Sequence, residues 1–395
     1  MSADVLIGVY PPAELSALRT RRRPPAFPFA EPGLTLTHLG RGAAWLALRA
    51  LGLGRGSRLA MPAYHCGSEV EAAHLAGIEL DFYRVDAQLR VDPEDLARAA
   101  AASDATYLIS CFGFPMPELD VGPPTRPPAG RVIEDAAHGL FSADGDGRPL
   151  GSRGDAAVFC PRKSLGTPDG GALLLRDEGR RIDAVTGRPE RGAMTRSVAS
   201  LAAGRAAMAR PRALRARAAR AMGRASRTDA AARQGTLTET VIGEWGLQPA
   251  DLDAAARSPS RLTAAAVTRV DGETIRSRRR RNYLSLRDEL AELTLEPFRE
   301  LPDGTCPLYF PVLAEDRGPA IASLLDHGVR ALEVWPVPHP ILDRTRFAEL
   351  EPVRHGLLAL PVHQAMREEH VEVVVRAAKA VFAPRAVPVV QPPLQ

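Results

Sequence analysis

The sequence predicts an α/β protein with two domains: a large one, whose mostly parallel sheet is flanked by helices, and a smaller α+β C-terminal one. Two observations support this fold class. The chain has 395 residues, which is more than one ordinary core holds. Short apolar segments also alternate with helical segments between residues 39 and 176. Such alternation is typical of parallel strands that are covered by helices on both faces.

The elements of the large domain can be assigned in chain order. Ala and Leu at helical spacing predict the first helix, and Asp92 before Pro93 marks the start of the third. The strands are short apolar runs. We expect helices over 42–51, 68–76 and 92–102, and strands over 58–62, 79–85, 106–112, 131–134, 156–160 and 172–176.

The C-terminal part predicts a smaller α+β unit. We expect a helical stretch over 260–290, strands over 308–313 and 331–335, and helices over 318–328 and 367–382. The predicted domain organisation is an N-terminal arm over 1–30, a large domain over 31–255 with a basic helical insertion at about 180–255, a small domain over 256–383, and a flexible Pro-rich tail over 384–395.

Bulk properties indicate a cytoplasmic protein. No apolar run reaches the roughly 20 residues that span a bilayer, and residues 1–11 lack the pattern of a signal peptide. The four cysteines form no CxxC pair, so we expect neither a disulfide framework nor a metal site. A net charge of +4 does not predict nucleic-acid binding.

Basic residues are concentrated between residues 179 and 234. The segment 197–227 interleaves many Arg with Ala, Met and Leu, so it could lie on an anionic membrane or bind a phosphorylated substrate. We favour a solvated helix, because Leu and aromatic residues are too sparse for strong membrane burial.

Lysine is nearly absent. Of 51 basic residues only Lys163 and Lys379 are lysine, so Arg is used wherever a positive charge suffices. A lysine can lose its proton and form an imine, whereas an arginine cannot. Lys163 follows a strand and precedes a Gly-Gly turn, and this position predicts a chemical role. Burial beside an aromatic cofactor would lower its pKa.

Two further segments complete a candidate site at the carboxyl ends of strands. Gly40-Arg41-Gly42 precedes a helix, whose N-terminal N–H groups can bind an anion. Asp135 ends an apolar strand, where a carboxylate can pair with the protonated pyridine nitrogen of pyridoxal phosphate (PLP). His138 could donate a hydrogen bond to the phenolic oxygen of that cofactor. The structural alternatives are a helix cap for Asp135 and a core histidine for His138.

In this order and spacing, the three segments resemble the DegT/StrS family of sugar aminotransferases, which have the PLP-dependent transferase fold type I. The similarity covers about residues 35–178 and resumes more weakly from about 260 to 381. The resemblance implies PLP as the cofactor, with Lys163 as the imine lysine and Asp135 as the pyridine partner. It places Gly40 and Arg41 at the phosphate and His138 where the family usually has Gln.

The sequence also departs from the family pattern. Cys160 falls where a phosphate-binding Ser normally lies, and a thiol is the weaker donor. Cys66 takes the place of the aromatic residue that stacks on the PLP ring, so stacking could fall to Tyr64 or His65. The family's contact from the neighbouring subunit aligns weakly with Ser260 and Arg261.

The resulting hypothesis is an aminotransferase that works as a homodimer. By resemblance, glutamate is the amino donor and a nucleotide-linked keto-sugar is the keto acceptor. Fold alone does not fix the reaction. Another PLP reaction, such as dehydration or decarboxylation, and a PLP-binding regulator without turnover therefore remain alternatives.

Overall fold

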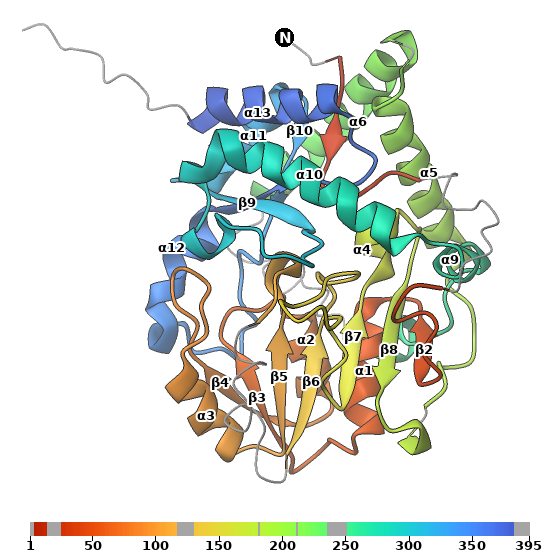
Figure 1. Cartoon of the computed structure of the whole chain (residues 1–395), viewed down its shortest axis with the longest axis vertical. Coiled ribbons are helices and arrows are strands. Elements are labelled where there is room, and N and C mark those ends of the chain that lie inside the picture. The colour runs from red at the N-terminus through yellow and green to blue at the C-terminus, as the bar shows by residue number, and fades with distance from the viewer. Residues whose placement is uncertain are drawn as a thin grey trace, which may run out of the picture.

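The computed structural model describes residues 4–13, 25–116, 130–180, 182–210, 212–234 and 251–382. A seven-stranded sheet organises the large domain (Figure 1). Its order is β2-β8-β7-β6-β5-β3-β4, and the pairs among β7, β6, β5, β3 and β4 are parallel. The strands are β2 (Leu34–Thr37), β3 (Arg58–Pro62), β4 (Glu79–Tyr83), β5 (Ala105–Ile109), β6 (Arg131–Asp135), β7 (Ala156–Phe159) and β8 (Gly171–Leu175). The expected mostly parallel sheet is confirmed.

Helices connect these strands: α1 (Gly40–Ala50), α2 (Ser68–Leu75), α3 (Pro93–Ala101) and α4 (Pro161–Leu165). Asp92 caps α3, because its carboxylate accepts from the N–H groups of Glu94 and Asp95. β2 pairs antiparallel with β8 and was not expected from the sequence. Nor was α4, which places Lys163 in a helical turn rather than in a loop.

The small domain contains a three-stranded antiparallel sheet in the order β11-β12-β9, made of β9 (Tyr309–Leu313), β11 (Leu332–Glu333) and β12 (Leu357–Pro361). Its main helices are α10 (Gly272–Leu290), α11 (Arg317–Asp326) and α13 (Glu368–Phe382). The stretch expected to be helical over 260–290 is two helices, α9 (Arg261–Val267) and α10. β12 was not predicted, although it is the central strand of this sheet.

The N-terminal segment is partly ordered into a strand. β1 (Ile7–Gly8) pairs parallel with β10 (Val329–Arg330), and Ile7 is fully buried. Part of the expected N-terminal arm therefore has regular structure, because its apolar side chains pack on the small domain. The predicted tail over 384–395 and part of the arm lie outside the described residues. The domain boundaries stay predictions.

The basic insertion contains two helices, α5 (Arg191–Ala207) and α6 (Arg212–Gln234), which pack against each other beside the small domain (Figure 1). Ala207 and Ala219 pack with Leu6 and Leu325. Within the residues that the structure describes, no helix combines the length and the apolar composition that crossing a bilayer requires.

Buried histidines make stability depend on pH. Burial lowers the pKa of His65 and His363 to about 3 and that of His370 to about 4. As the pH falls below 6.5, the unfolded chain binds protons at these rings while the folded chain does not, so the free energy of unfolding falls. Burial raises the pKa of Glu69 to about 7 and also raises that of Asp135, and these two carboxyls act in the opposite direction.

We therefore expect a lower melting temperature at pH 5 than at pH 7, measured by circular dichroism in matched ionic strength. Because four buried rings, His138 included, oppose two carboxyls, a melting temperature at pH 5 that equals or exceeds the value at pH 7 would contradict this account.

Candidate active site

A cavity of about 380 Å³ opens where the parallel strands β6 and β7 end. Ligands in sheets of this kind bind at the carboxyl ends of the strands. Seven residues that the sequence singled out line the cavity: Gly40, Arg41, Cys66, Asp135, His138, Cys160 and Lys163. The structure thus brings together side chains from four separate segments of the chain.

Asp135 lies at the end of β6 and faces the cavity. Its Oδ2 accepts a hydrogen bond from the Tyr107 hydroxyl at 2.7 Å, and its Oδ1 accepts one from the N–H of Ala137 at 2.9 Å. Burial raises the pKa of Asp135, although these donors and the nearby charge of Lys163 oppose the shift. A carboxylate so placed is poised to pair with a cation inside the cavity.

The neighbouring acid, Glu134, has a different task. Successive side chains of a strand point to opposite faces, and Glu134 points away from the cavity. Its carboxylate accepts from the N–H groups of Gly151 at 2.8 Å and Arg153 at 2.5 Å, and also from Gly154. Glu134 therefore shapes the loop that leads into β7.

His138 is held as a neutral donor. Burial lowers its pKa well below the ordinary value, and the charge of Lys163 adds to this effect. The N–H of Phe112 donates to its Nδ1 at 3.3 Å, so the ring proton is on Nε2. The rings of Phe112 and Trp335 lie nearly parallel to the imidazole, with centroids 6.0 and 5.3 Å away. This stacking fixes the ring plane.

Lys163 lies on α4, directly after Arg162, and lines the cavity. Burial by itself would lower its pKa, but the acidic groups of Cys160, Tyr10, Cys66 and Asp135 outweigh burial and raise it. Burial thus acts in the expected direction but is outweighed by these acidic groups, and the lowered pKa beside an aromatic cofactor stays a prediction.

The N-terminus of α1 borders the same cavity through Gly40 and Arg41. Gly42 does not line it. A Cβ at Gly42 would lie 2.1 Å from the carbonyl oxygen of Ala255, so this glycine is needed for the close approach of α8 (Leu252–Ala255). Gly42 thus serves packing rather than binding.

Tyr64 and His65 also lie outside the cavity lining. The Tyr64 hydroxyl donates to the carbonyl of Val334 at 2.9 Å. His65 Nδ1 contacts the carbonyl of Pro62 at 3.0 Å, and its Nε2 accepts from the N–H of His339 at 3.4 Å. Tyr64 and His65 thus form hydrogen bonds with the small domain. Because neither side chain lines the cavity, neither is placed to stack on a ligand there.

The small domain contributes Trp335 to the cavity. The φ of Trp335 is +47°, a conformation that costs about 1–3 kcal/mol for a residue with a side chain. Arg354 stabilises it by donating to the Trp335 carbonyl at 3.1 Å and to the Ala63 carbonyl at 2.7 Å. The Tyr64 ring packs beside the indole, 5.2 Å away.

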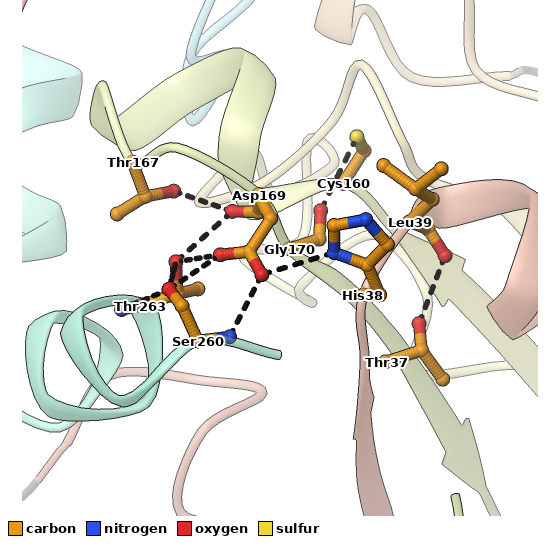
Figure 2. A network of polar contacts seen from close by, with 9 residues as sticks. All are labelled: Thr37, His38, Leu39, Cys160, Thr167, Asp169, Gly170, Ser260 and Thr263. Atoms are coloured by element: carbon orange, nitrogen blue, oxygen red, sulfur yellow. Dashed lines mark hydrogen bonds and ion pairs between the residues drawn. The ribbon is translucent and has the colours of Figure 1, made fainter. Parts of the chain in front are cut away.

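A buried carboxylate ties the segments around the cavity together (Figure 2). Asp169 has no exposed surface, and it accepts from the N–H and the hydroxyl of Ser260, each at 2.7 Å. The Thr263 hydroxyl also donates to it, and His38 Nδ1 lies 3.0 Å from its Oδ2. Ser260 is therefore occupied within its own chain, while Arg261 is exposed and does not line the cavity.

Known proteins resemble this chain both in sequence, over part of its length, and in fold. Residues 37–185 match the sequence model of the DegT/DnrJ/EryC1/StrS aminotransferase family. The matched range contains six of the seven strands of the sheet and the last residue of β2, together with Lys163 and Asp135. This part of the chain is therefore similar to the DegT/DnrJ/EryC1/StrS aminotransferase family.

Solved aminotransferase structures have the same fold. TlmJ from Streptoalloteichus hindustanus is 19% identical with a TM-score of 0.62, and the match covers 97% of this chain and 99% of that chain. The sugar aminotransferase CalS13 from Micromonospora echinospora is 17% identical with a TM-score of 0.58, over 95% and 100%. Spr1654 from Streptococcus pneumoniae, a candidate sugar aminotransferase in its PMP form, is 14% identical with a TM-score of 0.60, over 94% and 98%. No curated protein matches the chain significantly.

The residues that line the cavity fit PLP. The cavity brings a primary amine, a buried carboxylate and a neutral imidazole donor together beside a helix N-terminus. These groups match the aldehyde, the pyridine nitrogen, the phenolic oxygen and the phosphate of that cofactor. The four cysteines are all free.

Several cavity residues were missed from the sequence, namely Glu69, Glu71, Arg162, Trp335 and His339. Only Arg162 had a usable signal, since it directly precedes Lys163. His339 Nε2 lies 2.8 Å from the Glu71 carboxylate, but the two residues are far apart in sequence. No local pattern could have joined them.

The carboxylate of Asp169 offers a test of how the candidate site is held together. An Asp169→Asn chain presents an amide N–H₂ where the native oxygens meet donors, so donors from His38, Ser260 or Thr263 lose their acceptor. We expect the free energy of unfolding in urea to fall by about 1–3 kcal/mol. The matched control is Asp253→Asn, because Asp253 is exposed. An equal and small effect of both substitutions would contradict the role given to Asp169.

Proposed function

We propose that the protein is a PLP-dependent aminotransferase that takes an amino group from glutamate and transfers it to the keto group of a nucleotide-linked sugar. The observation that carries the proposal is that Lys163, Asp135 and His138 line one cavity at the carboxyl ends of β6 and β7. The donor and the acceptor rest on resemblance to the family and on its sugar aminotransferase neighbours.

Each of the three residues would have a distinct role. Lys163 Nζ would hold the cofactor covalently and, once released by the incoming amine, would move the proton from the substrate carbon. Asp135 would keep the pyridine nitrogen protonated, and His138 Nε2–H would donate to the phenolic oxygen. Bound PLP supplies an electron-accepting ring that stabilises charge at the substrate carbon.

The cavity walls would orient the substrate and exclude water. Trp335 presents an aromatic surface, while Glu71 and His339 form a buried polar pair. We place the protein in the cytoplasm, and its four free cysteines support a reducing compartment.

Glutamate should change the absorption spectrum of the purified protein carrying PLP. We expect the visible band of the lysine-bound cofactor to fall on addition of glutamate and to return on addition of a 2-oxo acid. Lys163→Ala should not show this cycle, because the cavity then has no lysine that can bind the cofactor covalently. A protein that binds PLP but keeps its spectrum in glutamate would be a binding protein rather than an aminotransferase.

Asp135→Asn should keep PLP bound but lose most of its turnover. The neutral amide cannot stabilise the protonated pyridine nitrogen, and such electrostatic losses reach about 100- to 1000-fold in kcat. Single-turnover kinetics with glutamate would measure the loss, with Asp146→Asn as an exposed control. Near-normal rates in Asp135→Asn would show that another acid has this role.

We also propose a homodimer in which Arg261 reaches the active site of the partner subunit. Arg261 lies exposed on α9 and does not line the cavity of its own chain, so its side chain is available for such a contact. Mixing a Lys163→Ala chain with an Arg261→Ala chain should then restore activity, because each hybrid dimer contains one intact site. Sedimentation of an active monomer, or mixtures without rescue, would remove this proposal.

A further inference from the structure

Arg162 is a cation of the cavity that the roles above leave unused. It lies on α4 between Pro161 and Lys163, and it lines the cavity together with Gly40 and Cys160. Its Nε is shut off from solvent and has no hydrogen-bond partner in the described part of the chain. An unsatisfied buried polar group of a native protein requires an explanation, and a ligand is one.

Cys160, Tyr10, Tyr309 and Asp169 stabilise the charge of Arg162, and the one carboxylate among them is already engaged. Asp169 stabilises the Arg162 charge from a distance, but its carboxylate oxygens accept from Ser260, Thr263 and His38. The guanidinium instead lies over the Tyr10 ring, with Cζ 5.9 Å from the centroid. A ring face attracts a cation but does not satisfy its N–H groups.

The surroundings of Arg162 point to a phosphate rather than another ligand. Cys160 is among the groups that stabilise the Arg162 charge, and its Cβ would lie 3.4 Å from a Cβ at Gly40. Gly40 begins α1, an eleven-residue helix whose N-terminal N–H groups favour an anion. Arg162 therefore lines the same cavity as a helix N-terminus.

We propose that Arg162 binds the phosphate group of PLP, and this inference rests on the proposed cofactor. Guanidinium and phosphate form strong charge-assisted hydrogen bonds in a fork geometry. Such a contact matters because the Cys160 thiol, a weak donor, already donates to the carbonyl of Gly170 at 3.5 Å. The chain then supplies a cation for the phosphate itself.

Three cofactor forms separate the phosphate contact from the rest of the site. We would titrate the cofactor-free protein, its Arg162→Met variant and its Arg180→Met variant with PLP, with pyridoxal and with inorganic phosphate. Arg180 is exposed and pairs with Asp177, so Arg180→Met is the matched control. Dissociation constants come from absorbance, and phosphate binding comes from the shift in melting temperature.

Arg162→Met should bind PLP about 10- to 100-fold more weakly, the loss that one charge-assisted contact implies. It should bind pyridoxal, which lacks the phosphate, as well as the wild type does. Inorganic phosphate should raise the melting temperature of the wild type and of Arg180→Met but not that of Arg162→Met. Arg162→Lys should recover part of the affinity, because it restores the charge but not the fork.

Other outcomes would overturn the proposal. Equal losses for PLP and pyridoxal would show that Arg162 supports the fold of the site. Unchanged PLP affinity with weakened glutamate binding would assign Arg162 to the carboxylate of the amino donor. If the wild type binds inorganic phosphate through Arg162 but neither PLP nor pyridoxal, the proposed function fails while the anion site remains.

Discussion

The buried carboxylate of Asp169 is the contact on which the arrangement of the site depends. It receives donors from the segment before α1, from the cap of α9 and from Thr263 within α9. A buried charge is tolerated only when its hydrogen bonds are satisfied, so these three partners must be present together. The turn after Lys163, the anion-binding end of α1 and the start of the small-domain helices are thereby fixed relative to one another.

Much of the large domain could be predicted from the sequence because its information is local. Apolar runs marked the strands, and the ends of these strands marked Asp135 and the turn that carries Lys163. The scarcity of lysine made Lys163 stand out. Because parallel strands end at one edge of the sheet, these local signals also predicted that the side chains would meet.

The remainder depends on contacts between distant segments, which no local pattern reports. β12 is apolar throughout but too short to be told apart from a loop or a core helix without its partners β9 and β11. The motif around Tyr64 predicts an aromatic ring that stacks on the cofactor. Its hydroxyl instead donates a hydrogen bond to the carbonyl of Val334 in the small domain. Trp335 enters the cavity only through a strained backbone that Arg354 holds.

The pairing of β1 with β10 sets an order of events during synthesis. Ile7 pairs with Val329, and the segment that follows β1 brings Tyr10 beside Arg162. A ribosome adding 5–20 residues per second needs roughly 16–64 s to make the chain between these two strands. Until then the first strand has no partner and one wall of the cavity is missing. The nascent protein can therefore assemble its central sheet early, but it closes its cavity only when translation is nearly complete.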